Sequence, residues 1–356
     1  MITVGTINTY SKRKISKKQK RRASIFESEI NAFQENSEKK CLICGKTING
    51  FCKSHSLPKF VLKCISSGGT IRTGKTFQSD SHIDKQGKKN ALVFYNLCKQ
   101  CDGNFFQEYE HEEFFCQKLS NEAINEIALK NYFRYLYKQQ REVLKFEKLL
   151  TETRDDAETK QFLENQLYLS KLNVDDTNAK IKKYLKRKHD QNFYVIDEID
   201  LDYSTAIAYQ GFITLVYGFD GLINNIYKYD EAYKIQQLGL CIFPHHTGTK
   251  IILFCEDGST RLKHFYKTFR RLSIEEKMYV MNYILLLYEE EWAVDGSFKE
   301  KLNKETLQLI NQRDTIVQET NNPLNILENE NLVDLARSIF ELKTNGNIYN
   351  FLSDKR

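Results

Sequence analysis

Apolar residues follow two spacings along the chain, and each spacing predicts its own kind of structure. Between residues 119 and 190 they recur every three or four positions with Lys and Glu between them, which predicts amphipathic helices. We expect an antiparallel helical hairpin there, broken near Thr151–Asp156 and again near Asn173–Asp176. From residue 191 to residue 270 the sequence is rich in β-branched and aromatic residues, which predicts strands.

The C-terminal part of the chain combines a predicted hairpin with predicted helices. The hairpin is LGLCIFPHHTGTKIILFCED, with its turn at His246-Thr247-Gly248. A helix follows and begins with a capping box, Ser273 to Glu276. Two more helices are predicted, ETLQLINQ and then PLNILENENLVDLARSIFELK, in which Pro323 lies near the start. The pattern therefore predicts an α+β fold.

A different pattern precedes the helical hairpin. The first 40 residues read as a basic arm that leads into a short helix, SIFESEINAFQ, and cysteine pairs, glycines and short apolar runs follow it. The stretch SSGGTIRTGKTFQSDSHIDKQGKKN predicts an exposed loop or weak hairpin, and DGNFFQEYEHEEFF predicts a helix. We therefore predict four segments: residues 1–40, 41–118, 119–190 and 191–356, the last being β-rich and closed by C-terminal helices.

Composition places the chain among ordinary soluble proteins. Hydrophobic residues make up 41% and charged residues 28%, and no apolar run is long enough to span a bilayer or to form a signal core. We therefore expect a cytoplasmic protein without membrane association. In such a reducing compartment the nine cysteines are expected to be thiols or metal ligands rather than disulfides.

The net charge of +6 is unevenly distributed. Residues 11–22 carry eight basic residues and no acid. One reading is a solvated tail. The other is a nucleic-acid-binding arm that gains affinity by releasing counterions from phosphates. In the second case the binding residues would be Lys12, Arg13, Lys14, Lys17, Lys18, Lys20, Arg21 and Arg22.

Two cysteine pairs give the strongest chemical signal in the sequence. They are Cys41-Leu-Ile-Cys44-Gly45 and Cys98-Lys-Gln-Cys101. Two residues between cysteines allow both sulfur atoms to face one ion, and the glycine permits the tight turn of a zinc knuckle. Four thiolates make a closed tetrahedral site, so we predict structural Zn²⁺ rather than four unrelated buried thiols.

The sequences around these pairs resemble a known enzyme family. CLICG, SHSLPKF and YNLCKQCD are similar to the cysteine-bearing branch of the HNH nucleases, whose ββα-metal core combines C-x-x-C, HHxxP and NLxxLCxxCH. The resemblance covers about residues 41–115. It implies a zinc-stapled treble clef and a metal-dependent phosphodiesterase that cuts DNA or RNA, as in bacterial phage defence or mobile elements.

The resemblance also assigns residues by position. His55, two residues before Leu57-Pro58, would be the base that deprotonates the attacking water. Asp102, directly after Cys101, would bind a catalytic Mg²⁺ or Mn²⁺, because a carboxylate oxygen suits such ions.

Two positions depart from the family pattern. Ser54 precedes the base where the family has His or Asp, and Val93 stands where an Asn is expected, although Asn96 is nearby. Residues that could substitute as ligands are His82, His111, Glu108, Glu110, Glu112 and Glu113.

Two alternative roles for His55 stay open. Cys52-x-x-His55 also has ligand spacing, so Cys41, Cys44, Cys52 and His55 could form the zinc site instead. In a degenerate treble clef, His55 would only form hydrogen bonds in a turn. The corresponding alternative function is a non-catalytic zinc module that binds nucleic acid, or a protein partner through residues 191–356.

Several more residues are expected to have structural rather than catalytic roles. His245 and His246 are expected at an exposed hairpin tip, and Trp292 in the core. The run KIKKYLKRKH is expected to be a solvated helix face, and DEIDLD is compatible with a metal site but lacks a partner motif. The remaining cysteines are expected to be core thiols: Cys64, Cys116, Cys241 and Cys255.

Overall fold

The computed structural model describes residues 39–66, 68–74, 86–87, 92–153, 157–219, 221–226, 228, 231–296, 298, 302–310 and 347–353. Several predictions lie outside these residues: the basic arm at 11–22, the short helix that follows it, His82 with most of the loop around it, the helix from Pro323, and the side chain of Cys116.

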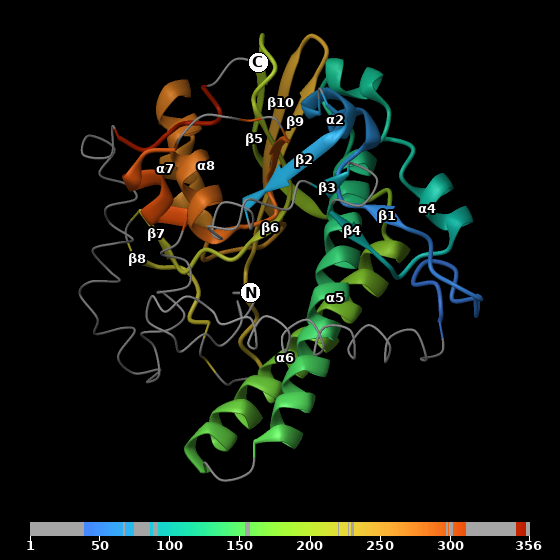
Figure 1. Cartoon of the computed structure of the whole chain (residues 1–356). Coiled ribbons are helices and arrows are strands. Elements are labelled where there is room, and N and C mark those ends of the chain that lie inside the picture. Colours follow the sequence, from blue (N-terminus) through green and yellow to red (C-terminus); the bar gives the residue numbers. More distant parts are fainter. Residues whose placement is uncertain are drawn as a thin grey trace.

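A seven-stranded antiparallel sheet forms the centre of the molecule (Figure 1). The strand order is β3-β2-β11-β6-β9-β10-β5. The strands are β2 (Thr70–Thr73), β3 (Gln86–Gly87), β5 (Phe193–Leu201), β6 (Ile207–Ile213), β9 (Leu238–His245), β10 (Gly248–Glu256) and β11 (Ala293–Asp295). The sheet therefore takes strands from both sides of the boundaries predicted at residues 118 and 190, which stay predictions.

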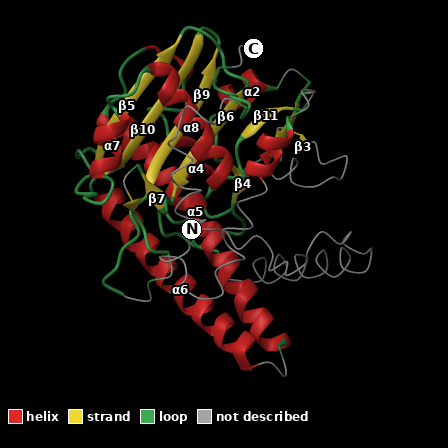
Figure 2. Cartoon of the chain, turned by 90° about the vertical axis from the view of Figure 1, so that its left-hand side faces the viewer, coloured by secondary structure: helices red, strands yellow, loops and turns green. Residues whose placement is uncertain are grey.

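Both faces of the sheet are buried, because side chains on successive positions of a strand point to opposite faces. In β9, Leu240 and Ile242 belong to one hydrophobic core, whereas Cys241 and Phe243 belong to the other. Helices α7 (Lys263–Phe269) and α8 (Ile274–Tyr288) cover the first face (Figure 2). Trp292 is fully buried in the first core, as predicted.

The second face carries the base of a long helical hairpin. Helix α5 (Asn121–Glu152) is followed by α6 (Ala157–Lys186), and the two extend well beyond the sheet (Figure 1). Ser120 caps α5 by accepting a hydrogen bond from the N–H of Ala123 over 3.0 Å. The hairpin itself was predicted from the spacing of apolar residues.

The second predicted break in this hairpin is wrong. Helix α6 runs without interruption through Asn173–Asp176, although Asn and Asp are weak helix formers. Packing on α5 compensates, because Val174 contacts the second core and Thr177 is buried. Asp176 also pairs with Lys180 one turn later, at 3.4 Å.

The cysteine-bearing segment packs beside the second face. An isolated bridge between Lys40 and Thr47 closes the first cysteine knuckle. Strand β1 (Ser54–His55) then pairs antiparallel with β4 (Val93–Phe94), and α4 (Lys99–Phe105) follows β4. Below, residues 39–66 and 92–105 together are called the zinc unit.

Between β1 and β4 the chain inserts elements that contact the main sheet. Helix α2 (Lys59–Ile65) begins directly after Pro58 and packs against β9 and β6. Of the predicted loop or weak hairpin, the structure forms the second, because β2 pairs antiparallel with β3; the predicted exposure is wrong for Ile71 of β2, which is fully buried in the main sheet. The predicted helix after Cys101 is also shorter than expected, since α4 ends at Phe105 and only a 3-10 turn, η1 (Glu112–Cys116), follows.

Several local predictions are confirmed. Strands β9 and β10 form the predicted hairpin, and Ser273 and Glu276 form the predicted capping box at the start of α8. The described residues 304–310 are helical, and a minor pair of short strands is formed by β7 (Tyr217–Gly218) and β8 (Gly221–Leu222). Within the described part of the chain, no helix is both long and apolar enough to cross a membrane.

Candidate metal centre and its surroundings

Four cysteines from two distant parts of the sequence meet in the zinc unit. The sulfur atoms of Cys41, Cys44, Cys98 and Cys101 all lie within 4.8 Å of one another. Around a tetrahedral zinc with bonds of about 2.3 Å, sulfur atoms are roughly 3.8 Å apart. The cluster therefore has the donor set and the size of a structural zinc site, and the predicted pairing of the two cysteine knuckles is present.

Backbone geometry holds these sulfur atoms in place. Gly45 adopts a left-handed φ of 69° and donates its N–H to the carbonyl of Cys41 over 2.8 Å, which turns the chain tightly after Cys44. Cys98 is the N-cap of α4, and its sulfur accepts the N–H of Cys101 over 3.4 Å. The knuckle and the start of α4 thus face each other.

The thiols of the cluster differ in acidity. Burial alone would raise the pKa of Cys41, but N–H groups of Cys44, Cys98 and Ile43 outweigh burial and lower the pKa to about 7. Burial, followed by hydrogen bonds with the other cysteines of the cluster, raises the pKa of Cys101. One thiolate therefore forms readily, and a cation that neutralises negative charge would favour ionisation of the others.

The short ribbon of β1 and β4 has an inner and an outer face. Ser54 pairs with Phe94, and both are fully buried, so they form the inner face. His55 pairs with Val93, and both are half-buried, so they form the outer face. Ser54, the first departure from the HNH pattern, thus points inward.

Cys52 and His55, which belong to the alternative set of zinc ligands, are not part of the cluster. The sulfur of Cys52 lies 3.2 Å from Oγ of Ser54, on the inner side of β1. Among the described residues, the one group of three or more potential ligands close enough to hold an ion consists of the four paired cysteines. The structure therefore does not bring Cys52 and His55 together with Cys41 and Cys44.

Asp102 lies in the first turn of α4 beside a buried lysine. Its Oδ1 atom is buried, forms no hydrogen bond within the described structure, and lies 3.9 Å from Nζ of Lys130. Lys130 itself is 2% exposed, pairs with Glu110, and stands 4.2 Å above the ring of Phe106. Burial raises the pKa of Cys52, and the negative charge of Asp102 adds to that rise.

The site offers a catalytic divalent ion one carboxylate ligand, that of Asp102. Mg²⁺ is often bound through one or two carboxylates, with water and substrate phosphate completing its shell, so Asp102 fits as one ligand. Ser54 is turned toward Cys52, and the amide of Asn96 is buried and donates to the carbonyl of Phe133 over 2.6 Å. Neither departure from the family pattern is therefore compensated by a described residue.

The candidate substitutes mostly have other partners. Glu110 pairs with Lys130, Glu112 pairs with His246, and His111 lies 3.0 Å from the side-chain oxygen of Gln107. Glu108 and Glu113 also belong to the described residues, and neither is grouped with Asp102 in a candidate ion site. Asp102 thus remains the one acidic side chain in the described zinc unit.

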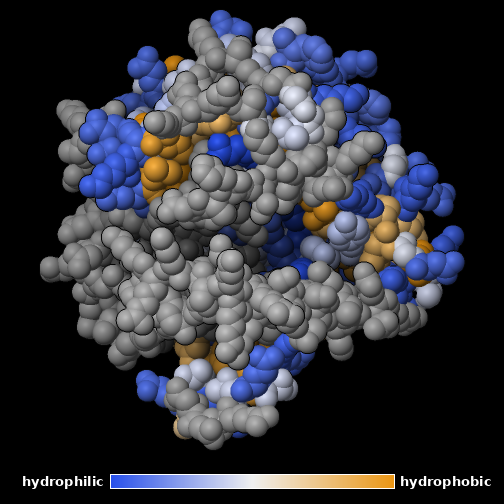
Figure 3. Space-filling view, viewed as in Figure 1, coloured by the Kyte–Doolittle hydropathy of each residue, from blue (hydrophilic) through white to orange (hydrophobic). Residues whose placement is uncertain are grey.

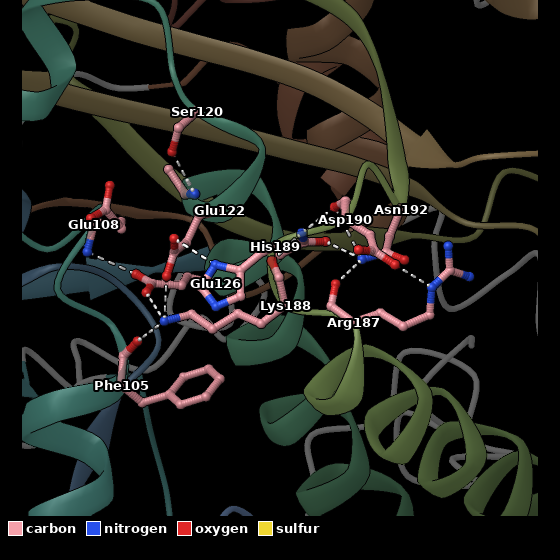
Figure 4. Close-up of polar contacts among 12 residues, drawn as sticks. Phe105, Glu108, Ser120, Glu122, Glu126, Arg187, Lys188, His189, Asp190 and Asn192 are labelled. Atoms are coloured by element: carbon pink, nitrogen blue, oxygen red, sulfur yellow. Dashed lines mark hydrogen bonds and ion pairs between the residues drawn. The ribbon is translucent and has the colours of Figure 1, made fainter.

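A buried ion network near the zinc unit was not predicted (Figure 4). Lys188, just after α6, lies 2.8 Å from a carboxylate oxygen of both Glu122 and Glu126 of α5. Glu126 also accepts the N–H of Glu108 over 2.9 Å, and His189 lies 3.0 Å from Glu122 (Figure 4). The network ties the loop after α4 to both long helices.

Burial and hydrogen bonding have opposite effects on the pKa values of the two carboxyl groups in this network. Glu126 is fully buried, and burial raises its pKa to about 7 despite the nearby Lys188. Glu122 is more exposed, and its hydrogen bond from Lys188 lowers its pKa. The sequence did contain a signal for this network. Glu122 and Glu126 are four residues apart on one helix, where two acids repel each other, so a cation from another part of the chain is expected beside them.

The other singled-out residues have structural roles. The expected exposure is wrong for His245, which is buried at the end of β9, where burial lowers its pKa; His246 is exposed as expected and bonded to Glu112. The acidic run on β5 is ion-paired, since Asp197 lies 2.7 Å from Lys277, and Asp200 lies 2.7 Å from Lys250. In the basic run at residues 180–189, three side chains are ion-paired: Lys180 with Glu256, Arg187 with Asp190, and Lys188 as above.

Two of the remaining thiols are core thiols, as predicted, and Cys64 is less buried than predicted. Cys241 and Cys255 are buried, and burial raises the pKa of both. Cys64 is partly buried, with its sulfur 3.4 Å from Oγ of Ser204.

The chain matches no protein-family model, no curated protein and no solved structure. The similarity to HNH nucleases therefore depends on the quoted residues of the zinc unit alone.

Proposed function

We propose that the protein is an HNH-like, metal-dependent phosphodiesterase that acts on nucleic acid. The observation that carries the proposal is the order of elements around the four cysteines. A knuckle is followed by the antiparallel pair β1–β4 and then by α4, whose first turn supplies the second cysteine pair. This is the order of a treble clef and of a ββα-metal core, in which a zinc ion would hold the scaffold.

In this proposal His55 and Asp102 perform the chemistry. His55 lies in β1 on the outer face of the ribbon and is half-buried. As a base, it would take a proton from the attacking water. A divalent ion on Asp102, when bound, would offset negative charge that develops on the phosphate.

A plasmid cleavage assay tests the enzyme proposal. Zinc-loaded protein is incubated with supercoiled DNA and Mg²⁺ or Mn²⁺, beside the variant His55→Ala. Loss of a general base typically costs about 10²–10⁴-fold in rate. The matched control is His246→Ala, because His246 is exposed at the β9–β10 turn, outside the zinc unit.

The result is informative in either direction. Nicking that needs the divalent ion, is lost in His55→Ala and persists in His246→Ala supports the proposal. Nicking that is equal in all three proteins points to a contaminant or another site. Zinc content and circular dichroism of each variant show that the fold is intact.

A second candidate function is a non-catalytic module that binds nucleic acid through the zinc unit, with residues 191–356 available for a protein partner. The observation that favours it is the position of Lys130. Its buried ammonium group pairs with Glu110 and lies 3.9 Å from Asp102. The carboxylate of Asp102, the proposed metal ligand, therefore already has a positive charge beside it. Ser54 offers no replacement ligand, because it is buried and turned toward Cys52. Binding without cleavage, unchanged in His55→Ala, would support this candidate.

A further inference from the structure

Positive charge is concentrated in the zinc unit. Its residues include seven lysines and one acid, Asp102. Residues 11–22 add eight basic residues, and the remainder of the chain has 38 basic and 46 acidic residues, a net charge of −8. The zinc unit is therefore a basic region on a chain that is otherwise acidic outside its N-terminal arm.

These lysines lie on the surface of the unit. The exposed ones are Lys40, Lys46, Lys53, Lys59, Lys63 and Lys99. Lys59 and Lys63 are one turn apart on α2, and Lys99 is the first residue of α4. The zinc unit lies at the right-hand edge in Figure 1, and the same edge in Figure 3 shows hydrophilic residues around a hydrophobic group.

The zinc-unit lysines differ from three extensively paired lysines elsewhere in the described structure. Lys188, Lys250 and Lys180 each contact two carboxylates. In contrast, the unit's own acid, Asp102, has its buried oxygen toward Lys130. No ion pair within the described residues involves Lys46, Lys59, Lys63 or Lys99, so their charge is left for an external partner.

The outer face of the β1–β4 ribbon lies within this region. Lys53 and Tyr95 flank the ribbon in sequence, directly before Ser54 and directly after Phe94. Lys53 is exposed, and Tyr95 is 37% exposed with its ring 6.0 Å from that of Tyr137. A cation and a phenol thus flank the ribbon that carries the imidazole of His55.

We propose that the zinc-unit lysines bind the phosphate backbone of duplex DNA and place it over His55. A duplex carries one charge per about 1.7 Å of its axis, which matches a region of several exposed cations. Single strands are usually held by several aromatic rings, and among the described residues Tyr95 is the one exposed aromatic ring of the unit. The acidic remainder of the chain repels DNA and thereby orients it toward this region. This inference deepens the proposed function, because it names the surface that presents the substrate to His55.

Charge reversal on α2 tests the surface. The variant Lys59→Glu/Lys63→Glu replaces two exposed lysines four residues apart on one helix. The matched control is Lys182→Glu/Lys186→Glu, which makes the same change on exposed positions of α6. Binding of the full, zinc-loaded chain to a short mixed-sequence duplex is measured by fluorescence anisotropy at several salt concentrations, without added Mg²⁺ or Mn²⁺.

The α2 variant should bind at least about tenfold more weakly, and its log–log salt slope should fall by about two, because each lost phosphate contact removes roughly 0.9 from the slope. The α6 variant should change affinity by less than about threefold. Equal losses in both variants, or no loss on α2, would overturn the proposal. Tighter binding of a single strand than of the duplex would overturn the choice of partner.

The experiment separates this inference from the proposed function, because it measures binding alone. Weak binding by the α2 variant, in a protein that never cleaves plasmid, would retain the surface and reject the enzyme. Normal binding by the α2 variant, in a protein that cleaves through His55, would reject the surface and retain the enzyme.

Discussion

Cys98 donates its backbone N–H to the sulfur of Cys41 over 3.3 Å, although 57 positions separate the two residues in the sequence. The bond joins the first knuckle to the residue that caps α4. It also helps to lower the pKa of Cys41, because an N–H donor stabilises a thiolate. The protein thus provides part of the site's geometry through its backbone, and a metal ion would complete it.

Removal of one sulfur should release the metal and destabilise the protein. Cys98→Ser leaves three thiolates and weakens both the site and the cap of α4. We expect loss of bound zinc and a decrease of about 4 kcal/mol in the free energy of unfolding, a size typical of lost metal sites. Elemental analysis and denaturant unfolding measure the two effects.

Cys64→Ser is the control for that experiment. Cys64 lies outside the cluster, with its sulfur 3.4 Å from Oγ of Ser204, and should be replaced without loss of zinc. Equal zinc content in Cys98→Ser and Cys64→Ser would contradict the four-cysteine site.

Lys130 should be important for stability because its buried ammonium group lies beside the carboxylates of Asp102 and Glu110. Lys130→Met leaves Glu110 and Asp102 without that partner, and breaking a buried pair commonly costs about 3–5 kcal/mol. Lys138→Met is the control, since Lys138 is more exposed and pairs with Glu291 at 2.6 Å; it should cost about 1 kcal/mol. Chemical denaturation compares them, and equal costs would contradict the internal role of Lys130.

The same variant distinguishes the two candidate functions. If Asp102 binds a divalent ion, removal of the competing ammonium should tighten Mn²⁺ binding, measured by electron paramagnetic resonance. Asp102→Asn should then abolish that binding. An absence of Mn²⁺ binding in both the wild type and Lys130→Met would support the non-catalytic module.

Glu126 should make stability depend on pH between about 4.5 and 7. Burial raises its pKa to about 7 from the usual 4.5, so in this range the folded protein keeps a proton that the unfolded chain has released. This contribution to stability is complete below pH 4.5 and is lost as the pH rises through 7. Glu126→Gln should therefore flatten the stability profile in that window by about 2 kcal/mol.

Glu122→Gln should change the pH dependence of stability in the opposite direction. Its pKa is lowered, first by the hydrogen bond from Lys188, so its contribution is present above pH 4.5 and is lost as the pH falls below that value. Thermal unfolding across the pH range measures both variants. A profile for Glu126→Gln that parallels the wild type between pH 4.5 and 7 would show that this carboxyl does not titrate there.

The residue pattern of the sequence predicted those elements that are stabilised by contacts between residues close in sequence. Strand β5 follows from its β-branched residues, the α8 capping box from Ser273 and Glu276, and the two cysteine knuckles from their spacing. In each case residues close in sequence supply the deciding contacts. The long helical hairpin also follows from its apolar period.

Features that depend on distant contacts were not predictable in the same way. The polar segment between the knuckles contributes strand β2 to the main sheet. Ile71 of β2 is buried where β2 pairs with β11, and this pairing joins distant parts of the sequence that the local residue pattern does not relate. Similarly, Lys130 follows α4 in the sequence, yet its position beside Asp102 depends on how α5 packs against α4. The Asn173–Asp176 segment stays helical because α5 covers it, which overrides its weak propensity.

X-ray absorption at the zinc edge of the purified full-length protein tests the central claim most directly. We predict one zinc per chain with four sulfur neighbours at about 2.3 Å. Three sulfur atoms and one nitrogen would instead indicate the set Cys41, Cys44, Cys52 and His55, and would remove His55 from any role as a base. Absence of zinc, or a shell of oxygen and nitrogen, would contradict the proposed thiolate centre altogether.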